Sequence, residues 1–160
     1  MNAHYLQHVP FEGLGSIESW LEAAGYMITK TQFFKSAKLP EPDQPDLLVV
    51  MGGPMSVNDE DAFPWHGETF ELPSGSIRLA RSQGCENQAF QFGRSVVGLQ
   101  FHIETTPESA QEIVKHCRNE LVPSEYIQTE SEILGAAPEK YRSINDLMNN
   151  VLSFLVKTND

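Results

Sequence analysis

A histidine and a glutamate with one residue between them stand at the end of an apolar stretch of this sequence. They are His102 and Glu104, in the segment GLQFHIETTPE at residues 98–108. On an extended segment, side chains two positions apart point to the same side, so the carboxylate would hold one imidazole nitrogen and leave the other as a base. This pair supplies two of the three members of a catalytic triad. The alternative is a strand end that carries two solvated polar side chains.

Two adjacent glycines follow the most apolar run of the chain. Gly52 and Gly53 lie in MGGPMSV at residues 51–57. Glycines at this place let backbone N–H groups approach a ligand or a developing oxyanion, where such donors stabilise a transition state. A tight turn after a strand is the simpler interpretation of the same residues.

A metal site is a further possibility, because His66 and Glu68 form a second pair with the same spacing as His102 and Glu104. Histidine and carboxylate side chains can hold zinc. Nothing in the sequence brings the two pairs together, and neither has the spacing of a helical metal motif, so no metal and no cofactor are predicted. The acidic run at residues 58–61 is interpreted as a solvated loop.

The elements that must position these residues follow the pattern of an α/β protein. Apolar residues at helical spacing predict a helix over residues 15–25, with Ser16 as its N-cap and Gly25 as its stop. A continuous apolar run is typical of a parallel strand that is covered on both faces. The strands predicted in this part of the chain are 4–9, 26–34 and 47–53.

The second part of the chain predicts short strands and then helices. Thr106 is the expected N-cap of a helix that begins at Pro107, with Glu108 in the first turn, where negative charge meets the helix dipole favourably. The three predicted strands are 77–82, 87–93 and 96–101. The expected buried stripe of the helix is Ile113, Val114, Cys117 and Leu121, and a final amphipathic helix carries Ile144, Leu147, Met148, Val151, Leu152 and Leu155.

Composition limits the classes of partner and compartment. With 22 acidic and 11 basic residues, the formal charge of −11 repels phosphate backbones and anionic lipid surfaces, so neither nucleic acid nor a membrane is an expected partner. The sequence has no long apolar segment and no pattern of a signal peptide. Two cysteines without a C-x-x-C motif fit a reducing compartment. The expectation is a soluble cytoplasmic protein.

Four stretches, taken in order, resemble one family. LLVVMGGPMSVNDEDAFPW, HGETFELP, NQAFQFG and VVGLQFHIETTPE are similar to the class I glutamine amidotransferases, specifically to stand-alone members like the amidotransferase domain of GMP synthase. The resemblance covers most of residues 1–120. It implies an α/β three-layer sandwich with a mixed, mainly parallel central sheet. It also implies hydrolysis of the glutamine side-chain amide by a Cys-His-Glu triad, which gives glutamate and ammonia for an acceptor.

The resemblance assigns a role to each candidate residue. The base of the family matches His102, the orienting carboxylate matches Glu104, and the oxyanion donors fall at Gly52 and Gly53. The ligand is then glutamine or another γ-glutamyl compound, which makes a γ-glutamyl hydrolase a related possibility. An ammonia-accepting synthetase is a possible partner, and an oligomer is possible.

One part of the family pattern has no counterpart in the sequence. The nucleophilic cysteine of the family lies in a G-x-C-x-G elbow between a central strand and a helix, and no such motif occurs here. The pattern stops at Trp65 and resumes at His66, so the central sheet is expected to be interrupted by a missing segment. An in-frame deletion would leave such a join, and so would an omitted segment, in which case the Cα atoms of these two residues would lie well beyond the roughly 3.8 Å of a peptide link.

The remaining cysteines are poor substitutes for that nucleophile. Cys85 lies in a polar turn between two predicted strands, and Cys117 lies on the buried stripe of a helix. A reactive cysteine needs exposure and nearby positive charge, which neither position offers. The sequence as written therefore lacks the nucleophile and predicts an incomplete triad.

The chain is expected to form a single amidotransferase-like domain over residues 1–160, with an N-terminal half at 1–65, a C-terminal half at 66–122 and a helical tail at 123–160. Because strands would lose a neighbour at the gap, the chain is expected to be poorly stable, to dimerise through strand edges or to re-pair its strands. The main alternative in function is a non-catalytic binding module that keeps the glycine loop and the His102–Glu104 pocket. A receiver-like or flavodoxin-like regulator is a weaker alternative, since it has no use for the later motifs.

Overall fold

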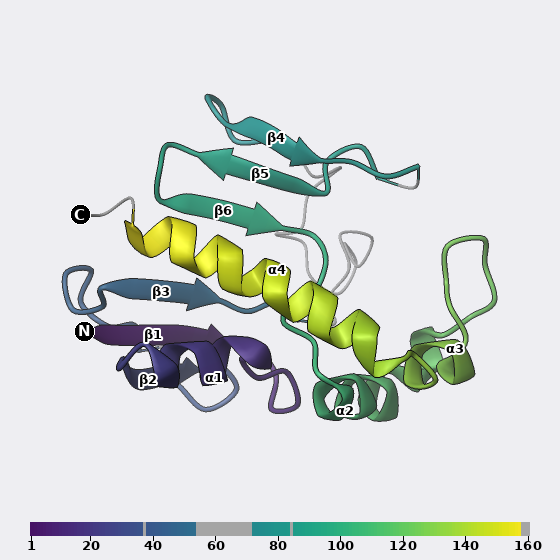
Figure 1. The fold of residues 1–160 in the computed structure, drawn as a ribbon. Coiled ribbons are helices and arrows are strands. Elements are labelled where there is room, and N and C mark those ends of the chain that lie inside the picture. Colours follow the sequence, from purple (N-terminus) through teal and green to yellow (C-terminus); the bar gives the residue numbers. More distant parts are fainter. Residues whose placement is uncertain (37, 54–71, 84, 158–160) are drawn as a thin grey trace. The chain divides into compact units, whose positions relative to one another are not determined.

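The computed structural model describes residues 1–36, 38–53, 72–83 and 85–157 (Figure 1). These divide into two compact units. Unit 1 contains Met1–Gly53 and Ile103–Val151, and unit 2 contains Pro54–His102 and Leu152–Asp160. The sequence predicted one domain with parts at 1–65, 66–122 and 123–160. The two units follow contacts between residues and do not coincide with these parts, so the domain organisation stays a prediction. The join between Trp65 and His66 lies outside the described residues, as do Glu68 and the acidic run at 58–61.

Unit 1 contains both strands and helices, and the elements described between residues 72 and 102 of unit 2 are all strands. Figure 1 labels them in chain order. The strands are β1 (Asn2–Gln7), β2 (Met27–Gln32), β3 (Leu47–Val50), β4 (Ile77–Ala80), β5 (Ala89–Phe92) and β6 (Val96–Leu99). The helices are α1 (Ser16–Ala23), α2 (Pro107–Cys117), η1 (Arg118–Glu120), α3 (Glu130–Leu134) and α4 (Pro138–Lys157).

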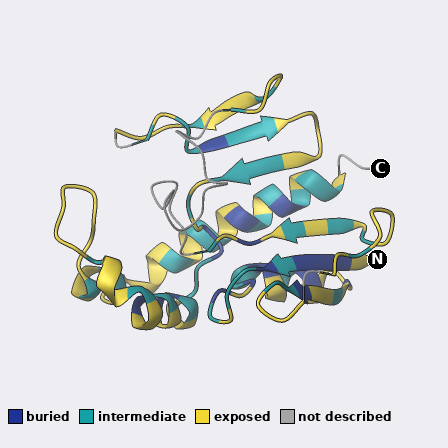
Figure 2. Ribbon diagram, turned by 180° about the vertical axis from the view of Figure 1, so that it is seen from behind, coloured by how far each residue is buried: buried dark blue, intermediate teal, exposed yellow. Residues whose placement is uncertain are grey.

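Unit 1 is built on a parallel sheet in the order β2-β1-β3. Of the three strands in this sheet, the central strand β1 carries most of the buried residues, which Figure 2 shows in dark blue. Ala3 and Tyr5 of β1 join Ile17 and Leu21 of α1 in the apolar core. Strand, helix and parallel strand therefore form a βαβ unit, as the sequence pattern predicted for this part of the chain.

Strand β3 differs from its prediction. The apolar run was expected to be covered on both faces, but Leu48 is 49% exposed and Val50 is 61% exposed, while Leu47 and Val49 are half-buried. In the described part of the chain β3 pairs only with β1, so its other edge carries no ladder there. An apolar edge strand with an exposed face agrees with a sheet that lacks a neighbour at this position.

Helix α1 confirms the predicted stop but not the predicted N-cap. Gly25 lies in the left-handed region at φ 76°, its N–H donates to Glu22, and the N–H of Tyr26 donates to Leu21 at 2.9 Å. These are the hydrogen bonds of a Schellman motif. The N-cap is Gly15 and not Ser16, and no side chain caps this end. The prediction was wrong because it relied on the hydroxyl, whereas a contact with a distant segment determines the backbone here.

The later helices follow the predicted pattern with differences in length and burial. Thr106 caps α2 through a capping box with Ser109, and Pro107 begins the helix as predicted. On the expected stripe only Val114 is buried, while Ile113, Cys117 and Leu121 are half-buried, because the helix ends at Cys117 and η1 follows. Helix α3 was not predicted. In α4, Met148 and Leu152 are buried as expected, but Leu147 is 49% exposed.

Unit 2 contains an antiparallel sheet in the order β4-β5-β6. The three predicted strands are confirmed with shorter bounds. Phe90 and Gly98 are cross-strand partners, and a Cβ on Gly98 would lie 2.2 Å from the Phe90 ring, so the ring fills the space that glycine leaves.

The α/β fold with a parallel sheet and helices is confirmed. In the part of the chain that the structure describes, the strands form two three-stranded sheets, one parallel and one antiparallel. None of the helices described is both long enough and apolar enough to cross a lipid bilayer.

Candidate functional site

His102 and Glu104 lie in an irregular segment between β6 and α2. Strand β6 ends at Leu99, and residues 100–106 belong to no strand. The expected extended segment is therefore wrong, and with it the argument that alternation alone points both side chains to one side. His102 is exposed and Glu104 is 8% exposed. Unit 2 ends at His102 and unit 1 resumes at Ile103, so the pairing of imidazole and carboxylate stays a prediction.

The backbone around Glu104 is held by hydrogen bonds from two helices of unit 1. The N–H of Ser16, in the first turn of α1, donates to the Glu104 carbonyl at 2.8 Å. The side-chain amide of Asn145, on α4, donates to the carbonyls of Ile103 at 3.1 Å and Thr105 at 2.9 Å. Three successive carbonyl groups therefore have defined partners, which fixes the peptide planes on both sides of Glu104.

Gly15 meets the same segment at very short range. Its backbone lies at φ 54° and ψ −131°, where side chains are strongly disfavoured. A Cβ at this position would lie 2.3 Å from the carbonyl oxygen of Glu104 and 3.3 Å from its side-chain Cγ. Only glycine allows the start of α1 to approach Glu104 this closely.

Directly after Glu104 the chain enters α2, whose first turn is tightly capped. The Thr106 N–H donates to the Ser109 hydroxyl at 2.8 Å, and the Ser109 N–H donates to the Thr106 hydroxyl at 3.2 Å. A capping box satisfies two backbone donors that would otherwise lack partners. The segment is thus fixed at its C-terminal end as well.

Glu104 and the glycine pair belong to the same edge of the parallel sheet. Gly52 and Gly53 follow β3, and Gly15 and Ser16 form the start of α1, which follows β1 in the chain (Figure 1). Since β1 and β3 are parallel neighbours, both chains leave the sheet at its carboxyl edge. Ligands of open α/β sheets bind at this edge. Gly52 is exposed and Gly53 is half-buried, and their role as oxyanion donors stays a prediction.

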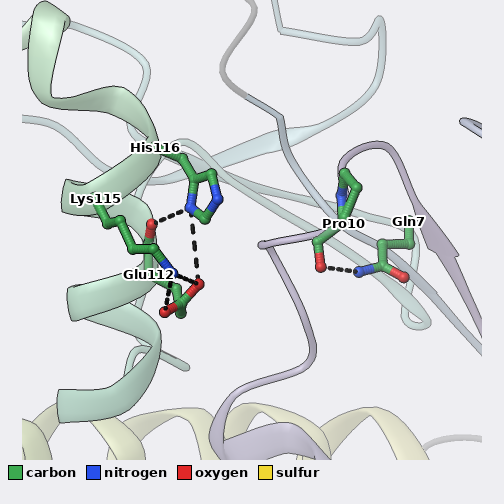
Figure 3. A network of polar contacts seen from close by, with 5 residues as sticks. All are labelled: Gln7, Pro10, Glu112, Lys115 and His116. Atoms are coloured by element: carbon green, nitrogen blue, oxygen red, sulfur yellow. Dashed lines mark hydrogen bonds and ion pairs between the residues drawn. The ribbon is translucent and has the colours of Figure 1, made fainter.

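The loop after β1 contacts α2. The ring of Phe11 stacks on the imidazole of His116, with centroids 4.4 Å apart and nearly parallel planes. Figure 3 shows the side chains of Lys115 and His116 directed toward Glu112, beside the loop in which the Gln7 amide donates to the Pro10 carbonyl. Of these contacts, the Phe11–His116 stacking joins the loop to α2, the helix whose start follows Glu104.

Neither cysteine has the environment of a nucleophile. Burial raises the pKa of the Cys117 thiol, and the neighbouring carboxylates of Glu120 and Glu12 raise it further. A thiol with a raised pKa stays protonated and is a weak nucleophile near neutral pH. The Cys85 thiol is half-buried in a turn of unit 2 and donates to the Asn87 carbonyl at 3.5 Å. Both observations agree with the sequence interpretation.

Among the described residues, no group of three or more histidine, cysteine, aspartate or glutamate side chains is arranged to hold a metal ion. The second candidate pair, His66 and Glu68, lies outside these residues, so the metal hypothesis that joined it to His102 and Glu104 is not tested.

The supporting residues of Glu104 were not identified from the sequence. Asn145 is one of several polar residues on an amphipathic helix, and nothing in its spacing connects it with a segment about forty positions earlier. Gly15 carried a weak signal, because a glycine directly before a helix that already has a serine available as N-cap suggests a close approach of the backbone.

No family model matches the chain, but the related sequence and the related structures described below are all named as glutamine amidotransferases or glutamine amidotransferase-like proteins. The glutamine amidotransferase-like protein YfeJ of Salmonella typhimurium is 23% identical, and the alignment covers 78% of this chain and 84% of that protein. The alignment runs over 202 residues, which exceeds the 160 residues of this chain. It therefore includes positions of the relative that have no counterpart here.

Two solved structures share the fold. A glutamine amidotransferase from Thermotoga maritima superposes with a TM-score of 0.79 at 20% identity over 98% of each chain. A glutamine amidotransferase from Methylobacillus flagellatus superposes with a TM-score of 0.85 at 20% identity, over 98% of this chain and 94% of the other. The resemblance seen in the sequence motifs is thereby confirmed, and the chain is glutamine amidotransferase-like in both sequence and fold.

Proposed function

We propose that this chain derives from an enzyme that hydrolyses the side-chain amide of glutamine, and that His102 and Glu104 are the base and the orienting carboxylate of its triad. The observation that carries the proposal is the fixed position of Glu104. Glu104 is buried, the backbone around it is held by hydrogen bonds on three successive carbonyls, and it belongs to the sheet edge from which Gly52 and Gly53 emerge. A solvated strand end would require none of this.

The chemistry assigned to these residues is the general one for a thiol nucleophile. The imidazole of His102 would take the proton of a cysteine thiol, and the thiolate would attack the amide carbon of glutamine. Backbone N–H groups of Gly52 and Gly53 would stabilise the oxyanion. The imidazolium would then give its proton to the departing ammonia, and water would hydrolyse the thioester to glutamate. Class I chemistry, glutamine or a γ-glutamyl compound as substrate, and a synthetase that accepts the ammonia are parts of this proposal.

The chain of 160 residues supplies the proposed base and orienting carboxylate but not the nucleophile. Its two cysteines, Cys85 and Cys117, lie in unit 2 and in α2, and the raised pKa of the Cys117 thiol disfavours the thiolate. We therefore expect no ammonia release from glutamine by a chain of 160 residues. Both cysteines are free thiols, which supports the proposed reducing, cytoplasmic compartment.

The test combines intact mass with turnover. At a mass of 17.9 kDa the purified protein should release no ammonia from glutamine, and saturable binding of glutamine would then identify it as a non-catalytic binding module. At a higher mass the elbow segment is present, and ammonia release should be lost on thiol alkylation and on His102→Ala. Lys140→Ala is the control, since it removes an exposed side chain of α4 and should leave turnover unchanged. Ammonia release by the 17.9 kDa protein that survives Cys85→Ser with Cys117→Ser would refute the thiol mechanism.

A further inference from the structure

The C-terminal helix α4 carries a side chain that acts on the candidate site from a distance in sequence. Asn145 is half-buried, and its single amide nitrogen lies 3.1 Å from the Ile103 carbonyl oxygen and 2.9 Å from that of Thr105. Carbonyl oxygens only accept, so the amide must present its nitrogen to them, and both of its hydrogens are used. Among uncharged side chains, only the amides of asparagine and glutamine offer two donors on one atom.

The two carbonyls that Asn145 binds lie on either side of Glu104. The carbonyl between them, that of Glu104, accepts from the Ser16 N–H at 2.8 Å. Because successive peptide planes are held from two different helices, neither plane at Glu104 can rotate without breaking a hydrogen bond. The direction in which the Glu104 side chain leaves the backbone is set by these planes.

We propose that Asn145 is a positioning residue for the catalytic carboxylate: through Ile103 and Thr105 it fixes the backbone from which Glu104 orients His102. The inference rests on the proposed function, since it assumes that Glu104 and His102 form a pair. It gives the C-terminal helix, which no sequence motif connected with the site, a defined part in the reaction.

The first measurement is local hydrogen exchange in Asn145→Ala. The Ser16 N–H bonds to the very segment that Asn145 holds, so its exchange should be faster by about tenfold when one supporting contact is lost. The Tyr26 N–H, which donates to Leu21 at the other end of α1, should keep its protection and so exclude global unfolding. Asn150→Ala is the matched control, because it makes the same change at an exposed position of α4. Unchanged exchange at Ser16 in Asn145→Ala would overturn the inference.

The second measurement separates positioning from support of the fold. A carboxylate beside an imidazole favours the imidazolium, so Glu104→Gln should lower the midpoint of the His102 titration followed by NMR. Asn145→Ala should lower it in the same direction by a smaller amount, and Asn150→Ala should not. If Glu104→Gln lowers the midpoint but Asn145→Ala does not, Asn145 only supports the fold and the inference is wrong.

The failure of the proposed function has a different signature. If Glu104→Gln itself leaves the His102 midpoint where it was, the pair does not exist and the proposed roles are refuted. The positioning role then falls with them, whatever happens to the exchange of Ser16. Asn145→Ser, which keeps one donor, provides a milder variant and should give effects between those of the parent protein and of Asn145→Ala.

Discussion

The close approach of Gly15 to Glu104 leads to a sharp prediction for Gly15→Ala. The alanine Cβ would lie 2.3 Å from the Glu104 carbonyl oxygen, closer than carbon and oxygen atoms approach without displacement. The backbone at φ 54° would be strained as well. Gly15→Ala should therefore push residues 103–105 away from α1 and break the hydrogen bond from the Ser16 N–H to the Glu104 carbonyl.

The magnitude follows from three contributions. Strain at a backbone conformation reserved for glycine costs about 1–3 kcal/mol, and the lost hydrogen bond costs about 0.5–1.5 kcal/mol. The reduced entropy of the unfolded chain returns about 0.4–1 kcal/mol. The expected loss of unfolding free energy for Gly15→Ala is about 2–3 kcal/mol, which lowers the urea midpoint by about 1 M at the usual slope for a small protein.

Substitutions at two other glycines of unit 1 separate the effect of backbone strain from the effect of the close contact with Glu104. Gly25 has a positive φ of 76° but no atom within 4 Å of a Cβ, so Gly25→Ala carries strain without the contact. Gly13 has neither feature, and Gly13→Ala should be neutral or slightly stabilising. Unfolding can be followed by the fluorescence of Trp20, on α1, in a Trp65→Phe background that removes the only other tryptophan. If Gly15→Ala destabilised unit 1 no more than Gly25→Ala, the close approach to Glu104 would be refuted.

Three further predictions concern titration, reactivity and association. Burial lowers the pKa of His4, so the unfolded chain binds a proton at this residue more readily than the native protein does. The stability should therefore fall as the pH drops below about 6.5, and His4→Gln should reduce the change of the urea midpoint between about pH 5 and 7. Because burial and nearby carboxylates raise the pKa of Cys117, alkylation of its thiol at about pH 8 should be several-fold slower in the native protein than in urea. Peptide mass mapping measures both rates, and equal rates would contradict a thiol that stays protonated in the native protein. The exposed apolar side chains of Leu48 and Val50 on β3 should promote self-association of the protein. The double substitution Leu48→Thr with Val50→Thr should therefore lower the weight-average mass measured by sedimentation equilibrium. An unchanged mass would show that these two side chains do not form the association surface.

The local order of the chain could be predicted from the sequence. Thr106, Pro107 and Gly25 mark helix ends through local chemistry, and the structure confirms each of them. All six described strands were predicted because apolar alternation and continuous apolar runs are local signals. The resemblance added the fold, since its motifs include residues that no periodicity would select.

What the sequence did not predict depends on contacts between distant segments. The choice of Gly15 over Ser16 as N-cap and the hydrogen bonds of Asn145 both depend on the meeting of α1, α4 and residues 103–105. Such meetings leave no periodic signal, because each partner is a single residue on an otherwise ordinary element. The same reason explains the exposed face of β3, whose covering would have to come from residues elsewhere in the chain.

The contacts that hold the backbone of Glu104 come from segments on both sides of the predicted gap at Trp65. Gly15 and Ser16 lie before the predicted gap at Trp65, and Asn145 lies far after it, so these contacts with residues 103–105 do not involve an elbow segment. If Glu104 is the orienting carboxylate of the proposed triad, contacts from α1 and α4 hold its backbone without the strand that would carry the nucleophile. On this proposal, loss of that strand would remove the first step of the reaction and leave these contacts of Glu104 unchanged. A strand, elbow cysteine and helix inserted between Trp65 and His66 would then restore the nucleophile to a chain in which the backbone of the orienting carboxylate is already held.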